Sequence, residues 1–175
     1  GENYVQEAIE KARTTADLDL EWHFIGPLQS NKTRLIAENF AWVHSIERLR
    51  IAERLSAQRP DSLPPLQVCV QVNVSGEASK SGCAPDEALA LCQAVAALPR
   101  LNLRGLMAIP ETADDFAAQR LPFHRLREIF ATVCAAGLPL DTLSMGMSHD
   151  LEAAIAEGAT IVRIGTAIFG ERNYA

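Results

Sequence analysis

The chain alternates between short apolar runs and longer stretches in which apolar and charged residues recur with helical spacing. Several of the apolar runs are rich in valine and isoleucine, which is typical of strands buried on both faces. The pattern predicts strands at 20–26, 41–46, 66–74, 101–110, 140–147 and 160–170. It predicts helices at 2–15, 31–40, 47–58, 85–98 and 150–158. A further helical region ends near Gly137, and we expect Pro122 to break it or to open its second part.

Alternation at this spacing indicates parallel strands joined by crossover helices. No Asn-Gly turn between apolar runs indicates a hairpin. An open doubly wound sheet and a closed (β/α)8 barrel of the TIM type both fit. No G-x-G-x-x-G follows a strand, which disfavours a dinucleotide-binding open sheet.

The first three residues, Gly1 to Asn3, have the character of a strand end that runs into a helix. We therefore expect an α/β fold, a TIM-type barrel in which the first strand and most of the second are missing. A six-stranded open sheet is the alternative. Residues 1–175 are expected to form a single domain, since this length suits one hydrophobic core.

Composition narrows the classes of function. The chain has 175 residues, 48% hydrophobic and 22% charged, with a formal net charge of -6. This acidity argues against a nucleic-acid partner, which needs a basic face. No apolar run reaches the roughly 18 to 20 residues of a membrane span. The four cysteines form no C-x-x-C pair or metal-binding spacing, so we expect reduced core cysteines, no metal and a cytoplasmic protein.

In a barrel, functional groups gather at the carboxyl ends of the strands. Ser148 precedes the predicted helix 150–158, and Gly165 and Thr166 stand near the end of the last strand. Hydroxyl groups and an unhindered glycine amide there can bind a phosphate group. The alternative is that Ser148 caps the helix and that Gly165 serves packing.

Arg163 lies among apolar neighbours in the last predicted strand and is expected to point into a semi-enclosed space. A guanidinium group stays charged and only donates hydrogen bonds. Facing a pyridine nitrogen, it would favour the unprotonated ring, which is a poorer electron sink. The alternative is a salt bridge to Glu111 or Glu171.

Five segments, in this order, together resemble the pyridoxal 5'-phosphate homeostasis protein family: GENYVQE, WHFIGPLQSNK, QVNVSGEASKSG, GLMAIP and SMGMSHDLEAAIAEGATIVRIGTAIFG. The resemblance implies a single-domain barrel like the N-terminal domain of bacterial alanine racemase. It implies bound pyridoxal 5'-phosphate (PLP) and a role in vitamin B6 and amino-acid balance without established turnover. Client enzymes that depend on PLP are possible partners, and a monomer is the default.

The resemblance also implies roles for particular residues. Phosphate contacts are expected for Ser148, Gly165 and Thr166, a pyridine-nitrogen contact for Arg163, and pocket positions for Asn3, Asn73 and Met107. Family members hold PLP as a Schiff base on a lysine that precedes the GENYVQE motif, and no residue here matches it. We assign that role to none of the lysines Lys11, Lys32 and Lys80, so no catalytic residue is predicted.

Two other functions are alternatives to a PLP carrier or regulator. A PLP-dependent racemase of this fold uses a tyrosine from a separate domain, and this chain has only Tyr4 and Tyr174. A metabolic barrel for a phosphorylated sugar would want a catalytic carboxylate or lysine at a strand end. His23 is interpreted as a packed strand histidine rather than a pocket residue.

Overall fold

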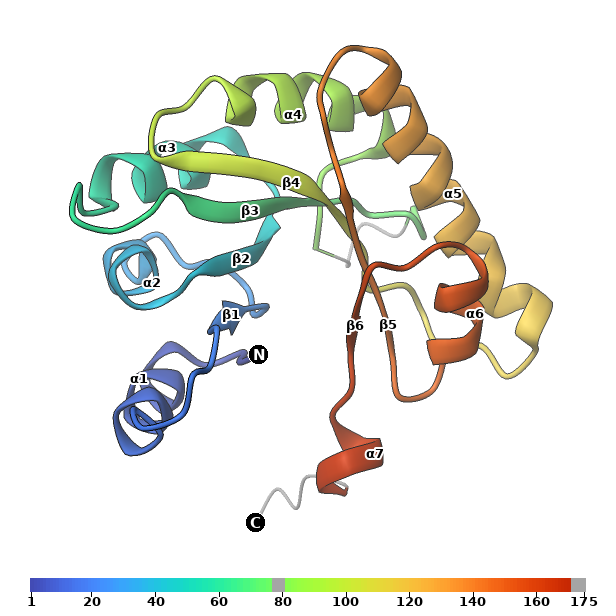
Figure 1. Ribbon diagram of the computed structural model, residues 1–175. Coiled ribbons are helices and arrows are strands. Elements are labelled where there is room, and N and C mark those ends of the chain that lie inside the picture. Colours follow the sequence, from blue (N-terminus) through green and yellow to red (C-terminus); the bar gives the residue numbers. More distant parts are fainter. Residues whose placement is uncertain (77–80, 171–175) are drawn as a thin grey trace.

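A six-stranded parallel sheet forms the centre of the protein in the computed structural model, which describes residues 1–76 and 81–170 (Figure 1). The strands lie in the order of the chain: β1 (His23–Phe24), β2 (Trp42–Ile46), β3 (Leu66–Gln71), β4 (Leu101–Met107), β5 (Thr142–Met147) and β6 (Ile161–Arg163). Each strand pairs in parallel with the next. The predicted parallel α/β fold of the barrel type is confirmed.

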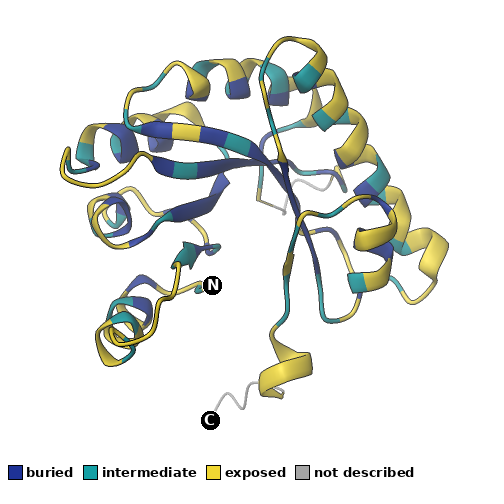
Figure 2. Ribbon diagram, viewed as in Figure 1, coloured by how far each residue is buried: buried dark blue, intermediate teal, exposed yellow. Residues whose placement is uncertain are grey.

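Helices α1 to α6 lie on the outer side of the sheet, whereas the short α7 lies beyond the end of β6, away from the sheet (Figure 1). They are α1 (Val5–Thr14), α2 (Thr33–Asn39), α3 (Leu49–Gln58), η1 (Pro85–Glu87), α4 (Ala88–Ala96), α5 (Phe116–Ala135), α6 (Leu151–Ala156) and α7 (Thr166–Phe169). In α3 the apolar positions repeat at helical spacing, so that Ile51, Ala52 and Leu55 are buried while Arg50 and Glu53 remain exposed. The main core lies between these helices and the sheet, whose strands are largely buried in Figure 2.

The sheet curls about its concave inner face. His44 on β2 and Ser144 on β5 are separated by two intervening strands, yet His44 Nδ1 lies 2.7 Å from Ser144 Oγ. A flat sheet would hold these strands about 14 Å apart, three strand spacings. A small second cluster of buried side chains, Trp42, Cys69 and Met107, fills part of this inner face. The described chain is therefore a curled part of a barrel.

The first residues form an isolated parallel bridge with β1, in agreement with the strand character predicted for Gly1 to Asn3. Glu2 pairs in parallel with Phe24, and its backbone N–H donates to His23 O at 2.9 Å. An added Cβ on Gly26 would lie 2.2 Å from Asn3 O, so the backbones can approach this closely only with glycine at that position.

One predicted helix break is wrong. Pro122 lies inside α5, which runs without interruption from Phe116 to Ala135. Proline removes one backbone donor and costs about 3 kcal/mol in a helix interior. Burial of Phe123, Leu126 and Val133 against the core outweighs this local cost.

The last strand is much shorter than predicted. β6 spans only Ile161–Arg163, and residues 166–169 form the short helix α7 in place of a strand. Gly165 is the residue that precedes this helix, and Thr166 begins it. Short apolar runs fit a helix as well as a strand, so the periodicity could not separate the two.

Candidate site at the carboxyl ends of the last strands

The ends of β5 and β6 lie side by side, because Met147 and Arg163 are partners in the parallel register. The Ser148 hydroxyl, one residue beyond β5, accepts a hydrogen bond from Ala167 N at 3.2 Å. Ser148 is not the N-cap of α6, since Asp150 holds that position. The Ser148 hydroxyl therefore faces the first turn of α7, where it contacts the backbone amide of Ala167.

Space is open beside Gly165. An added Cβ would meet no described atom within 4 Å, apart from the neighbours in the chain. Gly165 and Thr166 are exposed, and Ser148 is half-buried. This corner offers hydroxyl groups and backbone amides to a ligand, without a side chain on Gly165. Such donors suit an oxyanion such as a phosphate group.

The guanidinium of Arg163 is held from two sides on the inner face. Nη1 donates to Ser144 Oγ at 2.7 Å and Nη2 donates to Ala108 O at 2.9 Å. Burial lowers the pKa of Arg163 to about 10, although the carboxylate of Asp150 opposes that shift. The side chain is charged at neutral pH and points into the interior, as expected from the sequence. Of its two predicted alternative partners, Glu111 is exposed and Glu171 lies outside the described residues.

Behind Arg163, a series of polar side chains continues across the inner face. His44 Nδ1 contacts Ser144 Oγ at 2.7 Å, and His44 Nε2 contacts His23 Nδ1 at 2.8 Å. His23 Nε2 lies 3.2 Å from Glu21 Oε1. Burial is the main cause that lowers the pKa of His44 to about 3, and the charges of His23 and Arg163 add to it. Burial also lowers the pKa of His23, against the effect of Glu21. Both rings are therefore neutral at neutral pH.

Sequence reasoning missed His44 and the role of Ser144. His44 lies in a short, largely apolar strand, and a lone histidine at such a position carries no sign of its partner. His23, which we interpreted as a packed strand residue, is indeed packed: its ring stacks on Trp42 with centroids 5.1 Å apart and an interplanar angle of 6°.

The other predicted pocket residues lie at or beyond the ends of different strands. Met107 ends β4, is fully buried, and precedes the Ala108 carbonyl that binds Arg163. Asn73 follows β3, where its Oδ1 accepts from Gly76 N at 3.1 Å. Asn3 is exposed beside Gly26, at the β1 edge of the sheet. Their contacts with a cofactor stay predictions.

Two of the three lysines lie on the outside. Lys11 is half-exposed and its Nζ lies 2.7 Å from Glu2 Oε1. Lys32 is half-buried and precedes α2 as its N-cap residue, and Lys80 lies outside the described residues. Within ranges 1–76 and 81–170, no cluster of three or more metal-ligating side chains occurs. No helix in those ranges combines the length and the hydropathy that crossing a bilayer requires.

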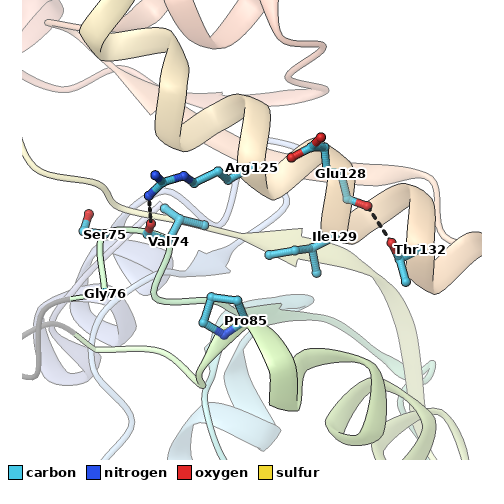
Figure 3. A pocket seen from close by; sticks show the side chains of 8 residues that line it. All are labelled: Val74, Ser75, Gly76, Pro85, Arg125, Glu128, Ile129 and Thr132. Atoms are coloured by element: carbon cyan, nitrogen blue, oxygen red, sulfur yellow. Dashed lines mark hydrogen bonds between the residues drawn. The ribbon is translucent and has the colours of Figure 1, made fainter.

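A separate cavity of about 430 Å³ lies between the segment that follows β3 and helix α5 (Figure 3). Arg125 projects across it and donates to Val74 O at 3.3 Å. The apolar part of the cavity wall is formed by Val74, Pro85 and Ile129. None of the residues predicted to bind the cofactor lines this cavity.

Comparisons with known proteins identify the family. Residues 1–173 match the family model described as alanine racemase, N-terminal domain. The chain is 67% identical over 174 residues to the pyridoxal phosphate homeostasis protein of Pseudomonas aeruginosa, and the match covers 99% of this chain and 74% of that protein.

Solved structures show the same fold. PipY of Synechococcus elongatus, solved without PLP and with PLP bound, superposes with TM-scores of 0.90 and 0.88 at 39% identity. Both matches cover 97% of this chain and 80% of PipY. Alanine racemase of Clostridium difficile superposes with a TM-score of 0.80 at 15% identity, over 98% of this chain and 44% of that enzyme. This last likeness concerns the fold alone.

Proposed function

The chain belongs to the family of pyridoxal phosphate homeostasis proteins, which have the fold of the alanine racemase N-terminal domain, and we propose that it binds PLP and serves PLP homeostasis. The observation that carries the proposal is the position of a half-buried cation, Arg163, close to a set of uncharged hydrogen-bonding groups that solvent reaches. PLP needs both features, since it joins a phosphate group to a pyridine ring. When bound, PLP supplies an aldehyde and a ring that can accept electrons.

The phosphate end is assigned to Ser148, Gly165 and Thr166. Ser148 and Thr166 contribute hydroxyl groups, and the bare Cα of Gly165 lets an anion approach the backbone amides. The contact between Ser148 Oγ and Ala167 N supports this assignment, because it brings the segment after β5 and the start of α7 together.

The ring end is assigned to Arg163. Its guanidinium has no acceptor atom and does not lose its charge, so it interacts favourably with the lone pair of an unprotonated pyridine nitrogen. Met107, Asn73 and Asn3 are proposed to line the rest of the pocket.

This assignment favours a carrier or regulator over a racemase. Racemisation benefits from a protonated ring that withdraws electrons, and Arg163 would oppose ring protonation. The likeness to an alanine racemase, at 15% identity, concerns the fold and not the reaction. We further propose that the protein acts as a single-domain monomer in the cytoplasm and that PLP-dependent enzymes are its clients.

The proposal is tested by calorimetric titration of the full-length natural protein. PLP and pyridoxamine 5'-phosphate are both used, because the second ligand lacks the aldehyde and reports on non-covalent contacts alone. Ser148→Ala and Arg163→Met are each expected to weaken pyridoxamine 5'-phosphate binding about tenfold, the loss of one hydrogen bond with charged character.

Matched controls come from exposed positions. Ser62→Ala and Arg13→Met make the same chemical changes away from the site and should leave affinity unchanged. Inorganic phosphate should compete with the ligand in the wild type and compete less well in Ser148→Ala. A wild-type protein that binds neither ligand would refute the proposed function.

A further inference from the structure

Five side chains form a continuous series of hydrogen bonds across the inner face, from Glu21 at the surface to Arg163 at the proposed ring contact. The series passes from β1 to β2, crosses the concave face to β5, and ends on β6. Each heavy-atom distance after the first is 2.8 Å or shorter. His44 and Ser144, at its centre, are 1% and 0% exposed.

The chemistry of the two ends determines the direction of every bond. A guanidinium only donates, so Ser144 Oγ must accept from Arg163 Nη1. The Ser144 proton then has His44 Nδ1, 2.7 Å away, as its acceptor. His44 in this form carries its proton on Nε2 and donates to His23.

Reasoning from the opposite end gives the same result. The Glu21 carboxylate only accepts, so a neutral His23 carries its proton on Nε2 and presents Nδ1 as an acceptor. That acceptor requires a proton on Nε2 of His44. Both ends therefore demand one tautomer of His44, with Nδ1 free to accept from Ser144.

We propose that His44 is a positioning residue of the cofactor site: by accepting the Ser144 proton it turns the oxygen lone pairs toward Arg163 and fixes the guanidinium plane. This inference rests on the proposed function, in which Arg163 faces the ring nitrogen. Ala108 O supplies the second fixed point of that plane. Each Nη nitrogen bears two hydrogens, so one on each remains for a ligand.

The surroundings of His44 suit this role. Its ring lies against Trp42 and His23, with centroids 5.7 and 5.1 Å away, which restricts rotation about its side-chain bonds. Because the pKa of His44 is lowered to about 3, mainly by burial, its Nδ1 remains an acceptor throughout the physiological range. A protonated His44 would have no acceptor to offer Ser144.

The first measurement needs no ligand. ¹⁵N NMR of the histidine rings in the full-length natural protein should show His44 with a protonated Nε2 and an unprotonated Nδ1. The side-chain Nη signals of Arg163 should be resolved in the wild type and broadened by exchange in His44→Leu, in which Ser144 has lost its acceptor. The opposite tautomer, with the proton on Nδ1, would overturn the proposal.

The second measurement follows the ring nitrogen of bound pyridoxamine 5'-phosphate labelled with ¹⁵N. At neutral pH the wild type should hold it unprotonated. His44→Leu should move its resonance toward the protonated position and weaken binding roughly fivefold. His44→Asn, whose Oδ1 can accept from Ser144, should restore both values toward the wild type.

Controls separate positioning from stability. Val133→Ala removes buried methyl groups from α5, far from the inner face, and should lower the melting temperature without moving the ring resonance. If His44→Leu does not fold, Ser144→Ala interrupts the same series and should move the resonance in the same direction. Wild type that binds no ligand refutes the proposed function, whereas binding with no change in His44→Leu or Ser144→Ala refutes the inference alone.

Discussion

Glu157 offers a sharp test of how the helical layer is held together. This residue is the C-cap that follows α6, its side chain is 1% exposed, and three basic residues of α5 surround its carboxylate. Oε1 accepts from Arg120 Nε at 2.7 Å. Oε2 lies 3.1 Å from His124 Nδ1 and 3.3 Å from Arg127 Nη1. Glu157→Gln keeps the shape and removes the charge that these partners need.

The expected loss is about 2 kcal/mol at pH 7. Hydrogen bonds to a buried charge contribute roughly 1.5–3 kcal/mol each. The three partners are 43–46% exposed, so water screens much of their attraction and the sum is well below the full value. Glutamine also retains one acceptor for Arg120.

The loss should depend on pH in a defined direction. Burial alone would raise the pKa of Glu157, but the hydrogen bonds from Arg120 and His124 outweigh it and lower the pKa from its usual value of 4.5. A lowered carboxylate pKa stabilises the folded state above the unfolded value, and this stability is lost as pH falls through the folded pKa. The gap between wild type and Glu157→Gln should therefore be constant above about pH 5.5 and shrink below about pH 4.5.

Urea unfolding followed by circular dichroism measures both quantities. Glu152→Gln, an exposed change on the same helix, is the control and should shift the free energy of unfolding by less than about 0.5 kcal/mol. Equal stability of Glu157→Gln and wild type at pH 7, or a gap that persists unchanged at about pH 3, would refute the reasoning.

Three further predictions concern glycines and thiols. Gly105→Ala would place Cβ 1.7 Å from Thr142 O, a backbone atom of the paired strand. Urea unfolding should show that the free energy of unfolding falls by at least about 3 kcal/mol, or that no folded protein forms. Near-normal stability would contradict the strand register. Gly165→Ala has free space, so its melting temperature should match the wild type while pyridoxamine 5'-phosphate affinity falls about tenfold, and unchanged affinity would remove Gly165 from the phosphate site. In the native protein a thiol reagent should react quickly with the half-buried Cys134 and slowly with the buried Cys69, Cys83 and Cys92. Burial raises the pKa of these three thiols to about 11 or 12. Their fast reaction would show that the core opens.

The strand pattern was predictable because parallel strands covered by helices are buried on both faces. Such strands are mostly apolar and do not alternate with exposed positions, as in β2, in which every residue is buried, and helices separate them at regular intervals. The strand character of Gly1 to Asn3 could also be predicted, because Glu2 pairs with β1 and α1 begins three residues later.

Local rules failed where tertiary contacts decided the outcome. Proline has a strong local preference against helix interiors, yet the packing of α5 keeps Pro122 inside the helix. Residues 166–169 carry an apolar sequence that a strand would also accept, and their helix is evident only in three dimensions.

Part of the site could be derived from the sequence, namely the residues that share one strand end. Ser148, Arg163 and Gly165 are close in the chain or on neighbouring strands, so their proximity follows from the parallel order. His44 and Ser144 could not be joined in this way. A hydrogen bond between strands that are not neighbours depends on how far the sheet curls, and periodicity carries no information about that.

Because the strands pair in the order of the chain, each β/α unit emerging from the ribosome can add to the edge left by the unit before it. Every such pairing closes a loop of one helix and its turns, at a modest cost in chain entropy. The bond between His44 and Ser144 joins residues 100 positions apart, and so it can form only after β5 has been synthesised. The proposed ligand pocket is thus completed only when the last strands have been synthesised.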